Sequence, residues 1–586
     1  TTTTINTNHT TTTTTTTNNN NNNAPPSFEL VDATTNVVVM TNPATQVGDQ
    51  AFNLTGQELW VLDFSSFTTP GWYRVRVAGV GVSHVFQISD RVFDQIATAA
   101  HRGAYHARCG CELSSNLTRF NRSVCHAHDA TIVPTNPLPA WFAKKFNLTS
   151  QDMFPEKQRA SGTVTMAAHG HHDAGDYSKY TVSGAMFVSY MLLAFENKTM
   201  ALRLARDDGQ IPEAYNGIPD IVDEAKWELD WLAGMQDPGD GGAYCIIKPN
   251  GTIDGWYQQG MPDEQHNDDR IALPKDTTCT GMLAGVLAMA ASSSAMQTHF
   301  PKALIAKWRA QAEAAWVFLG RNANKTALCY QAYGCGVTTG AGSGCNNTAA
   351  DNDMSHHTRV FAALQLYKAT GNQTYHDYFL SQHCPHYRHY TWEPLPYGED
   401  SGAGYTLATM SYALFQNNPN RSFATDPTMA DACISELAYA ARFRLNSSLS
   451  TYKLMMPDAI LRYRQYGWFF PQAISYTLLI AVAANAITNQ SLINEIEVAV
   501  LATWDYLLGA NPVGHSLITG FGAQRMRAIV DQDSVNDHID PPVAGIPVDI
   551  YTHTDTHSLS PPHTRTHTHS LSPPHTRTHT HSLSPP

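Results

Sequence analysis

The chain has 586 residues, of which 42% are apolar and 15% charged, and its formal net charge is −13. This length and apolar share suffice for two to four globular domains with a large core. The acidic balance, without a cluster of Lys or Arg, argues against a nucleic-acid partner, and no apolar run is long enough to cross a membrane.

Both ends of the chain are low in complexity. Residues 1–26 are runs of Thr and Asn, and residues 551–586 repeat the unit HTRTHTHSLSPP. Neither segment has enough apolar side chains to offset the entropy of ordering, so we expect two disordered tails. For the second tail, metal binding by its histidines is the alternative.

Residues 27–91 are predicted to form strands. The segment 72–77, WYRVRV, alternates strictly between two faces, and VFQI at 85–88 follows a glycine-rich turn. Only about five strands fit here, fewer than the seven of a complete immunoglobulin-type sandwich. We therefore predict a small, shortened β-sandwich of that type.

Over residues 92–550 the apolar period becomes helical, without βαβ alternation. The candidate helices are 93–107, 181–196, 219–236, 278–297, 303–320, 355–369, 403–416, 428–443, 470–485 and 491–508. The stretch within 278–297 is apolar on nearly all sides, which is typical of a helix surrounded by other helices. The sequence therefore predicts a mainly α domain built as a double-layered barrel.

The motif HGHHDAGDYSKY at 169–180 carries two carboxylates, Asp173 and Asp176, on either side of Ala-Gly. This spacing lets both point into one cavity from a tight turn, where two acids can hold and deprotonate a water molecule. That is the base half of an inverting glycosidase. The alternative is structural, with the aspartates capping a helix that begins near Tyr180.

A second group of residues could bind metal. Cys109, Cys125, His126 and His172 offer two thiolates and two imidazoles, which suit a tetrahedral structural zinc ion. Their spacing is not that of a common zinc finger. A Cys109–Cys125 or Cys111–Cys125 disulfide beside unrelated histidines is therefore the alternative. Zinc would fix the loop of the acid pair, since His172 immediately precedes it.

Several segments resemble glycoside hydrolase family 9. DAGDYSKY looks like the DAGD motif of the family, IPDIVDEAKWELDWLAGMQ (218–236) like its next helix, and WDYLLGANPVGHSLITGFG (504–522) like the segment before its substrate-binding histidines. The likeness covers residues 27–548. It implies an (α/α)6 barrel and an endoglucanase of cellulase type, which hydrolyses β-1,4-glucan with inversion. By this resemblance Asp176 is the general base and Asp173 its water-holding partner.

The resemblance also implies ligands. Members with an immunoglobulin-like front domain carry a similar Cys, Cys-His, His set as a zinc site. Calcium also occurs in the family, and Asp223 and Glu224 lie where oxygen ligands could gather, although an exposed acidic helix face is the alternative and we assign no calcium ligands. In YGWFF (466–470), similar to the aromatic segment of the family's cleft, Tyr466 and Trp468 are the candidate sugar platforms, with core packing as their alternative.

Two departures from the family bear on activity. Where the family has His-His-Arg, this chain has Val530, Asp531 and Gln532, and no glutamate follows Glu497, although the family's general acid is a glutamate beyond residues 545–549. Losing acid–base help costs about 10²–10⁴-fold in rate, so the polypeptide as written is expected to be nearly inactive. The alternatives are a non-catalytic glucan-binding pseudoenzyme and an exo-acting β-glycosidase of the same fold.

The compartment is inferred from modification signals. The ten cysteines, three of them in one glycine-rich loop (Cys329, Cys335 and Cys345), fit an oxidising environment. Asn-x-Ser/Thr acceptors occur at Asn53, Asn116, Asn121, Asn147, Asn197, Asn250, Asn324, Asn346, Asn372, Asn420, Asn446 and Asn489. We expect a secreted, monomeric glycoprotein whose partner is a polysaccharide, although the chain opens on Thr1 without a signal peptide.

Overall fold

The computed structural model covers much of both predicted domains. The residues that it describes are 11–14, 26–47, 59–126, 130–132, 163–164, 168–173, 177–196, 205–209, 211–249, 270–273, 275–322, 354–383, 403–419, 421–449, 487–509, 515–522, 524–525, 539 and 541–546.

The front of the chain forms two facing sheets. One has the order β3-β2-β6-β7, with β8 also paired to β6, and the other has the order β1-β5-β4. The alternation of WYRVRV is confirmed, because Tyr73, Val75 and Val77 are buried while Trp72 is 52% exposed. The strands are β1 (Thr11–Thr14), β2 (Ser27–Asp32), β3 (Val38–Pro43), β4 (Thr45–Val47), β5 (Leu59–Leu62), β6 (Gly71–Val77), β7 (Gly81–Val82) and β8 (Phe86–Ile88).

Strand β1 lies inside the segment 1–26 that we expected to be a disordered tail. It pairs antiparallel with β5, from Thr11 opposite Leu62 to Thr14 opposite Leu59. Threonine is β-branched and favours strands, and a neighbouring strand supplies hydrogen-bond partners that composition cannot reveal. The expectation is therefore wrong for these four residues, and the sandwich has more strands than the five predicted.

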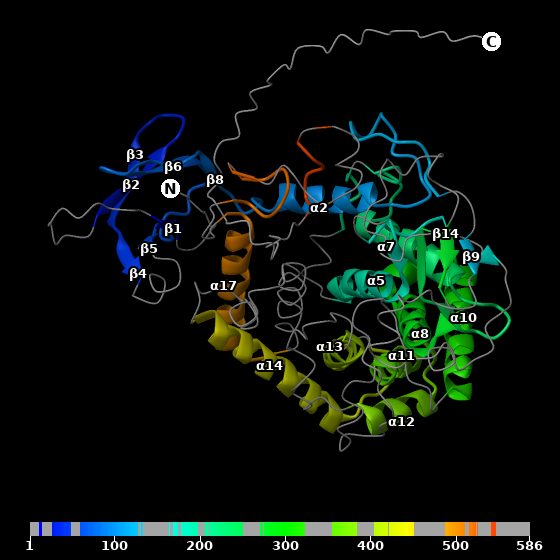
Figure 1. Ribbon diagram of the computed structural model, residues 1–586. Coiled ribbons are helices and arrows are strands. Elements are labelled where there is room, and N and C mark those ends of the chain that lie inside the picture. The colour runs from blue at the N-terminus through cyan, green and yellow to red at the C-terminus, as the bar shows by residue number, and fades with distance from the viewer. Residues whose placement is uncertain are drawn as a thin grey trace, which may run out of the picture.

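The second domain is a ring of helices (Figure 1). Along the ring α2 packs on α7, α7 on α5, α5 on α8, α8 on α11, α11 on α13, α13 on α14 and α14 on α17. The helices are α2 (Asp94–His106), α5 (Thr181–Glu196), α7 (Asp220–Gly234), α8 (Thr277–Ser292), α9 (Ser294–His299), α10 (Lys302–Arg321), α11 (Met354–Thr370), α12 (Gln373–Gln382), α13 (Ala403–Asn417), α14 (Pro427–Leu449) and α17 (Gln490–Leu507).

Helix α8 is the predicted inner helix, since every residue from Thr277 to Ala291 is buried. It contacts α11 closely at Gly285, where an added Cβ would meet the ring of Phe361. The predicted single helix 278–297 instead breaks at Ser293, whose ψ of 127° is extended, and resumes as α9. The candidate helix 470–485 lies outside the described residues.

Short strands lead into the inner helices. β11 (Lys179–Tyr180) runs directly into α5, and β15 (Lys275–Asp276) runs directly into α8. One sheet has the order β10-β9-β14-β13-β11, and β12 pairs with β15. The remaining strands are β9 (Ala130–Ile132), β10 (Thr163–Val164), β12 (Ala243–Tyr244), β13 (Ile246–Pro249) and β14 (Arg270–Ala272). These pairings bring the first turns of α5 and α8 to one end of the ring.

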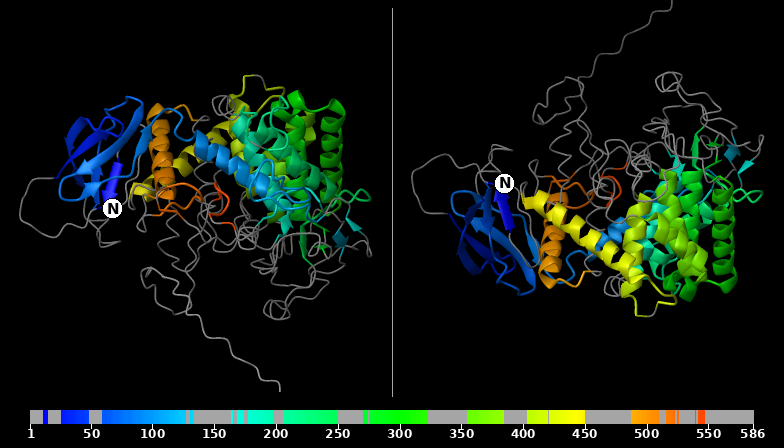
Figure 2. Two further views of the ribbon diagram at one scale, coloured as in Figure 1. Left: turned by 90° about the horizontal axis from the view of Figure 1, so that it is seen from above. Right: turned by 90° about the horizontal axis from the view of Figure 1, so that it is seen from below.

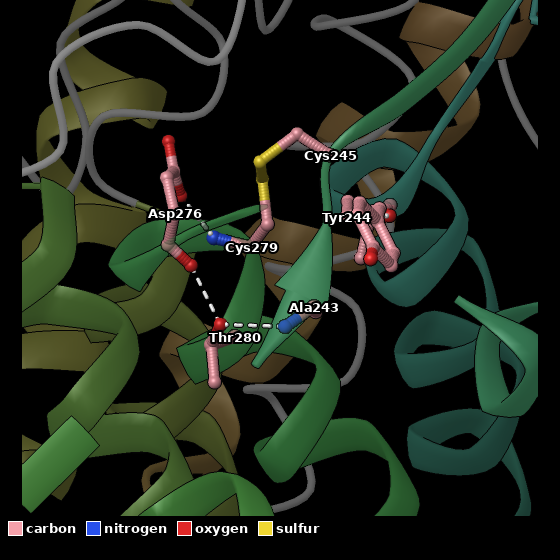
Figure 3. The surroundings of a disulfide bond; sticks show 7 residues. Ala243, Tyr244, Cys245, Asp276, Cys279 and Thr280 are labelled. Atoms are coloured by element: carbon pink, nitrogen blue, oxygen red, sulfur yellow. Dashed lines mark hydrogen bonds between the residues drawn. A yellow bond between two sulfur atoms is a disulfide. The ribbon is translucent and has the colours of Figure 1, made fainter. Parts of the chain in front are cut away.

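A disulfide cross-links the chain at this end of the ring of helices. Cys245, between β12 and β13, is bonded to Cys279 in the first turn of α8, with a Cα–Cα distance of 5.4 Å (Figure 3). Asp276 caps the same turn, because its Oδ1 accepts a hydrogen bond from Cys279 N at 2.8 Å. The disulfide therefore ties the strand connection to the start of an inner helix.

The ring closes where segments far apart in sequence meet. Phe93 lies 6.5 Å from Trp504 of α17, ring centroid to ring centroid, and Arg119 Nη2 donates to Pro541 O at 2.7 Å. Gly545, at φ +93°, lies so close to Ala99 of α2 that any Cβ would clash with its carbonyl group. The sandwich lies beside α17 in all three views (Figures 1 and 2).

Candidate active site and metal centre

The loop of residues 168–173 carries Asp173, the first aspartate of the motif, and lies beside residues 107–109 at the end of α2. Two antiparallel backbone hydrogen bonds of 2.8 Å join them, from Cys109 N to Gly170 O and from His172 N to Ala107 O. Beyond the loop, Asp173 N donates to Ser178 O at 2.9 Å. Asp173 is exposed. Asp176 lies outside the described residues.

The backbone on both sides of Asp173 is strained. His169 and Tyr177 have φ values of +65° and +55°. Such conformations cost a non-glycine residue about 1–3 kcal/mol and persist only where the surroundings impose them. Lys179 Nζ donates to His169 O at 2.7 Å, and Trp227 Nε1 donates to Gly170 O at 3.1 Å. Tertiary contacts therefore set the path of this loop against local preference, which is common at functional sites.

The four predicted zinc ligands come together. The ligand atoms of Cys109, Cys125, His126 and His172 all lie within 4.8 Å of one another. The separations are 3.5 Å from Cys109 Sγ to His126 Nδ1, 3.9 Å from Cys125 Sγ to His172 Nε2 and 3.2 Å between the two imidazole nitrogens. Ligands on a tetrahedral zinc ion with bonds of about 2.0–2.3 Å lie about 3.3–3.8 Å apart. We call these four residues the Cys/His cluster, and its geometry fits zinc.

The protonation of the Cys/His cluster also suits a metal. Burial lowers the pKa of His126 to about 4 and that of His172 to about 3, so both imidazoles are neutral at pH 7. Burial opposes ionisation of Cys109, but its hydrogen bond with Cys125 and the charge of Lys179 hold the Cys109 pKa well below its ordinary range. Neutral imidazoles and a thiolate are the forms that bind a metal ion.

The disulfide alternatives are wrong. Cys109, Cys111 and Cys125 take part in no disulfide in this structure. Arg122 Nη1 lies 3.1 Å from Cys125 Sγ, and Gly110 N lies 3.3 Å from the same sulfur. The hydrogen bond with Cys109 and burial hold the Cys125 pKa well above its ordinary range, and these two donors partly oppose that shift, as the outer shell of a thiolate ligand does.

The candidate calcium residues fit a cation poorly. Glu224 is fully buried, so the alternative of an exposed acidic face is wrong for it. Its two oxygens accept from Arg108, at 2.7 Å from Nε and 3.0 Å from Nη2. Asp223 is also buried, which raises its pKa to about 6, and it accepts from Asn216 Nδ2 at 3.0 Å. Calcium needs six to eight oxygen ligands, and Glu224 is already paired with a guanidinium.

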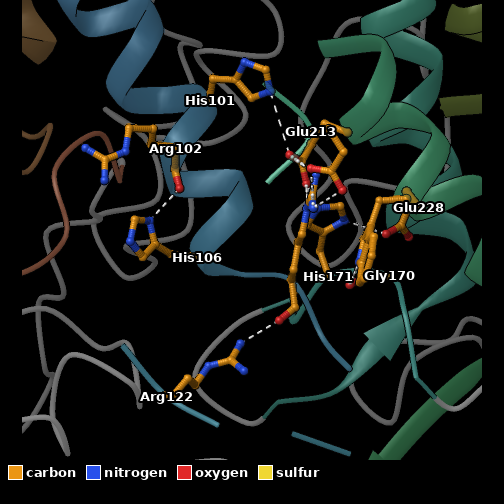
Figure 4. Close-up of polar contacts among 11 residues, drawn as sticks. His101, Arg102, His106, Arg122, Gly170, His171, Glu213 and Glu228 are labelled. Atoms are coloured by element: carbon orange, nitrogen blue, oxygen red, sulfur yellow. Dashed lines mark hydrogen bonds and ion pairs between the residues drawn. The ribbon is translucent and has the colours of Figure 1, made fainter. Parts of the chain in front are cut away.

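Sequence reasoning missed the charged network behind the loop (Figure 4). His171 Nε2 lies 2.6 Å from Glu224 Oε1, and His171 Nδ1 lies 2.7 Å from Glu228 Oε2. Burial alone would lower the pKa of His171, but the hydrogen bonds that it donates to these two carboxylates raise it to about 9. Arg108 also forms an ion pair with Glu213, with 3.0 Å between Nη1 and Oε1. The available signal was a pair of glutamates four residues apart, and so on one face, of α7.

Other predicted site residues cannot be placed. The described residues do not include Tyr466, Trp468 or the three residues that replace His-His-Arg. None of the helices in the described part of the chain combines the length and apolar character needed to span a bilayer.

Comparison with known proteins shows the family of both domains. Residues 93–565 match the model described as glycosyl hydrolase family 9, and residues 7–82 match the cellulase N-terminal ig-like domain. Endoglucanase D of Acetivibrio thermocellus is 25% identical over 492 residues, which cover 83% of this chain and 68% of that protein. The xyloglucan-specific endo-beta-1,4-glucanase BoGH9A of Bacteroides ovatus is 25% identical over 504 residues, which cover 83% and 75% of the two chains.

A solved structure gives the same result. A metagenome-derived glycoside hydrolase family 9 endoglucanase superimposes with a TM-score of 0.71 at 25% identity, over 92% of this chain and 87% of that one. The predicted architecture, a mainly α (α/α)6 barrel behind an immunoglobulin-like sandwich, is thereby confirmed. Because the family model spans most of the chain and the fold agrees with it, the chain belongs to glycosyl hydrolase family 9 and is a glucan-hydrolysing enzyme by descent.

Proposed function

We propose that this protein is a secreted endo-β-1,4-glucanase that acts with inversion, with Asp176 as the general base and Asp173 as its partner in holding the attacking water. The observation that carries the proposal is the loop of Asp173. Its side chain is exposed, while the backbone on either side is strained and fastened by tertiary contacts. Two relatives, endoglucanase D and a xyloglucan-specific endo-beta-1,4-glucanase, support the choice of a glucan.

The chemistry assigned to this loop is the base half of the reaction. In an inverting hydrolase one carboxylate removes a proton from water as the water attacks the anomeric carbon, and an acid on the other side protonates the leaving oxygen. Asp176 would accept the proton of the water, and Asp173 would orient that water. We assign no residue to the acid, since no glutamate follows Glu497 in this sequence.

Zinc is the metal that fits the Cys/His cluster. Bound there, it would cross-link the residues after α2 to the loop of Asp173 and would supply no chemistry to the reaction. His172 adjoins Asp173, so the cluster fixes one end of the catalytic loop. Secretion is supported by the Cys245–Cys279 disulfide, because such bonds persist in oxidising compartments.

A substrate whose leaving group needs no proton tests the base half by itself. With β-cellobiosyl fluoride, water attacks the anomeric carbon, the carbon–fluorine bond breaks, and the water proton passes to Asp176. We expect fluoride release with the α-anomer of cellobiose formed first, detected by a fluoride electrode and by proton NMR. Asp176→Asn should lower the rate by about 10²–10⁴-fold. Asp230→Asn, on α7 and paired with Lys226, serves as a control that leaves the rate unchanged.

Cellulose derivatives complete this test. If an acid operates, soluble cellulose is cut as well, and viscosity that falls faster than reducing ends appear identifies internal cleavage. Release of one small product from chain ends would identify the exo-acting alternative instead. A β-anomer as the first product, or fluoride release unaffected by Asp176→Asn, would refute the proposed roles.

A non-catalytic glucan-binding protein is the second candidate. It is favoured by Val530, Asp531 and Gln532 at the positions where the family carries His-His-Arg. Titration with cellohexaose, followed by tryptophan fluorescence beside the fluoride assay, separates the two. Binding without fluoride release supports this second candidate, and release of fluoride rejects it.

A further inference from the structure

Two adjacent histidines in the loop of Asp173 have opposite environments. His172 belongs to the Cys/His cluster, whereas the side chain of His171 points to α7 and contacts two carboxylates (Figure 4). The backbone explains the difference. His171 forms an antiparallel β-bridge with Arg108, and consecutive side chains of bridged, strand-like backbone point to opposite sides.

His171 is held at both nitrogens. Glu228 Oε2 lies 2.7 Å from Nδ1, and Glu224 Oε1 lies 2.6 Å from Nε2. An ionised carboxylate only accepts hydrogen bonds, so each ring nitrogen donates a proton. The ring of Phe187 from α5 packs edge-on against the imidazole, with 5.1 Å between centroids. The side chain is thereby fixed in position and in orientation.

The two glutamates need this partner. Glu224 is fully buried and Glu228 is 2% exposed. Arg108 neutralises Glu224, at 2.7 Å from Nε, but it also pairs with Glu213. Glu228 has His171 Nδ1 as a hydrogen-bond partner, 2.7 Å from its Oε2. A buried carboxylate that loses its partner carries a large desolvation penalty, so the network favours the state in which His171 stays against α7.

Glu228 cannot follow a moving loop. A Cβ added at Gly184 of α5 would collide with Glu228 Oε1, so the carboxylate sits tightly between α5 and α7. Gly170, at φ +72°, lies against the ring of Trp231, which also belongs to α7. The loop therefore contacts α7 at two neighbouring points, a carboxylate and an indole.

We propose that His171 is a positioning residue. Held between Glu224 and Glu228, it anchors loop 168–173 to α7 independently of the Cys/His cluster and so fixes Asp173. The Cys/His cluster then holds His172 on one side of the loop, and the two glutamates hold His171 on the other side. The catalytic consequence rests on the proposed function of Asp173, but the anchoring itself does not.

His171→Gln tests this anchor, with His106→Gln as the matched control. His106 is another buried histidine with both nitrogens bonded, to Arg102 O at 2.6 Å and Thr118 Oγ1 at 2.8 Å, and it lies outside the loop. Three quantities are measured on the full chain: amide hydrogen exchange in a peptide covering residues 168–173, zinc content, and kcat and KM on β-cellobiosyl fluoride.

We expect exchange in residues 168–173 of His171→Gln to be at least about tenfold faster than in the wild type, because the loop opens locally. Zinc content should stay unchanged, and kcat should fall about tenfold or more with KM within about twofold, since small misplacements of a catalytic group mainly slow the chemical step. His106→Gln should leave the exchange of this peptide and both kinetic constants at wild-type values.

Unchanged exchange in a folded His171→Gln protein would overturn the proposal, and so would loss of zinc, which would show a single anchor rather than two. If His171→Gln does not fold, Glu228→Gln, which keeps the shape and removes one charge, should speed the same exchange, and its failure to do so would also overturn the anchor. If the wild type releases no fluoride, the proposed function fails, while the exchange data still decide on His171.

Discussion

Replacing Cys245 and Cys279 together by alanine removes the cross-link between the strand connection and the first turn of α8. The disulfide closes a loop with a sequence separation of 34 residues. In the chain-entropy account such a loop restricts the unfolded chain by about 12.6 cal/mol/K, or about 3.8 kcal/mol at 25 °C. We therefore expect the free energy of unfolding of the barrel to fall by about 4 kcal/mol.

Guanidinium unfolding followed by far-UV circular dichroism measures this change. With an m value of about 5 kcal/mol/M, the midpoint should fall by about 0.8 M, and reduced wild-type protein should approach the same value. Cys433→Ala is the control, because it removes a buried sulfur that takes part in no cross-link. A midpoint shift no larger than that of Cys433→Ala would refute the entropic reasoning.

Three further predictions follow from the same end of the barrel. Removing zinc with a chelator should lower the melting temperature, with one zinc per chain lost by elemental analysis; a folded protein without zinc and without any shift would contradict the fit of the Cys/His cluster. Gly170→Ala should destabilise more than Gly217→Ala in thermal unfolding, because both have positive φ but only the first would also press a Cβ against Trp231. Burial raises the pKa of Asp276 to about 6, above its unfolded value of about 3.9, so the folded state binds this proton more tightly and stability should rise as pH falls from about 7 to about 4. Asp276→Asn should flatten that dependence in unfolding curves recorded across this range, and an unchanged slope would refute it.

The helices of the barrel could be predicted from apolar periodicity, and α5 has the predicted bounds of residues 181–196. The break at Ser293 was missed, because the apolar side chains Ala295 and Met296 resume after the three serines 292–294, although serine is a common capping residue. Helix α12 was also missed, since QTYHDYFLSQ has a mixed surface without a clear apolar stripe.

The Cys/His cluster was predictable because its residue types are soft ligands in the number that zinc requires. The partners of His171 were not, since Glu228 lies 57 residues further along the chain and no local pattern joins them. The Cys245–Cys279 disulfide was missed for a similar reason, because sequence does not give pairing among ten cysteines. The roles of Asp173 and Asp176, which came from resemblance and motif spacing, stay predictions.

The contact between Arg119 and Pro541 has a consequence for biosynthesis. The two residues are 422 positions apart, so the ribosome, at about 5–20 residues per second, needs about 20–85 s to deliver the second after the first. Throughout that interval α2 has emerged while its partners at the seam do not yet exist, so this part of the ring stays incomplete and open to chaperones. Yield from a heterologous host should therefore depend on chaperone supply during translation more than on the stability of the finished ring.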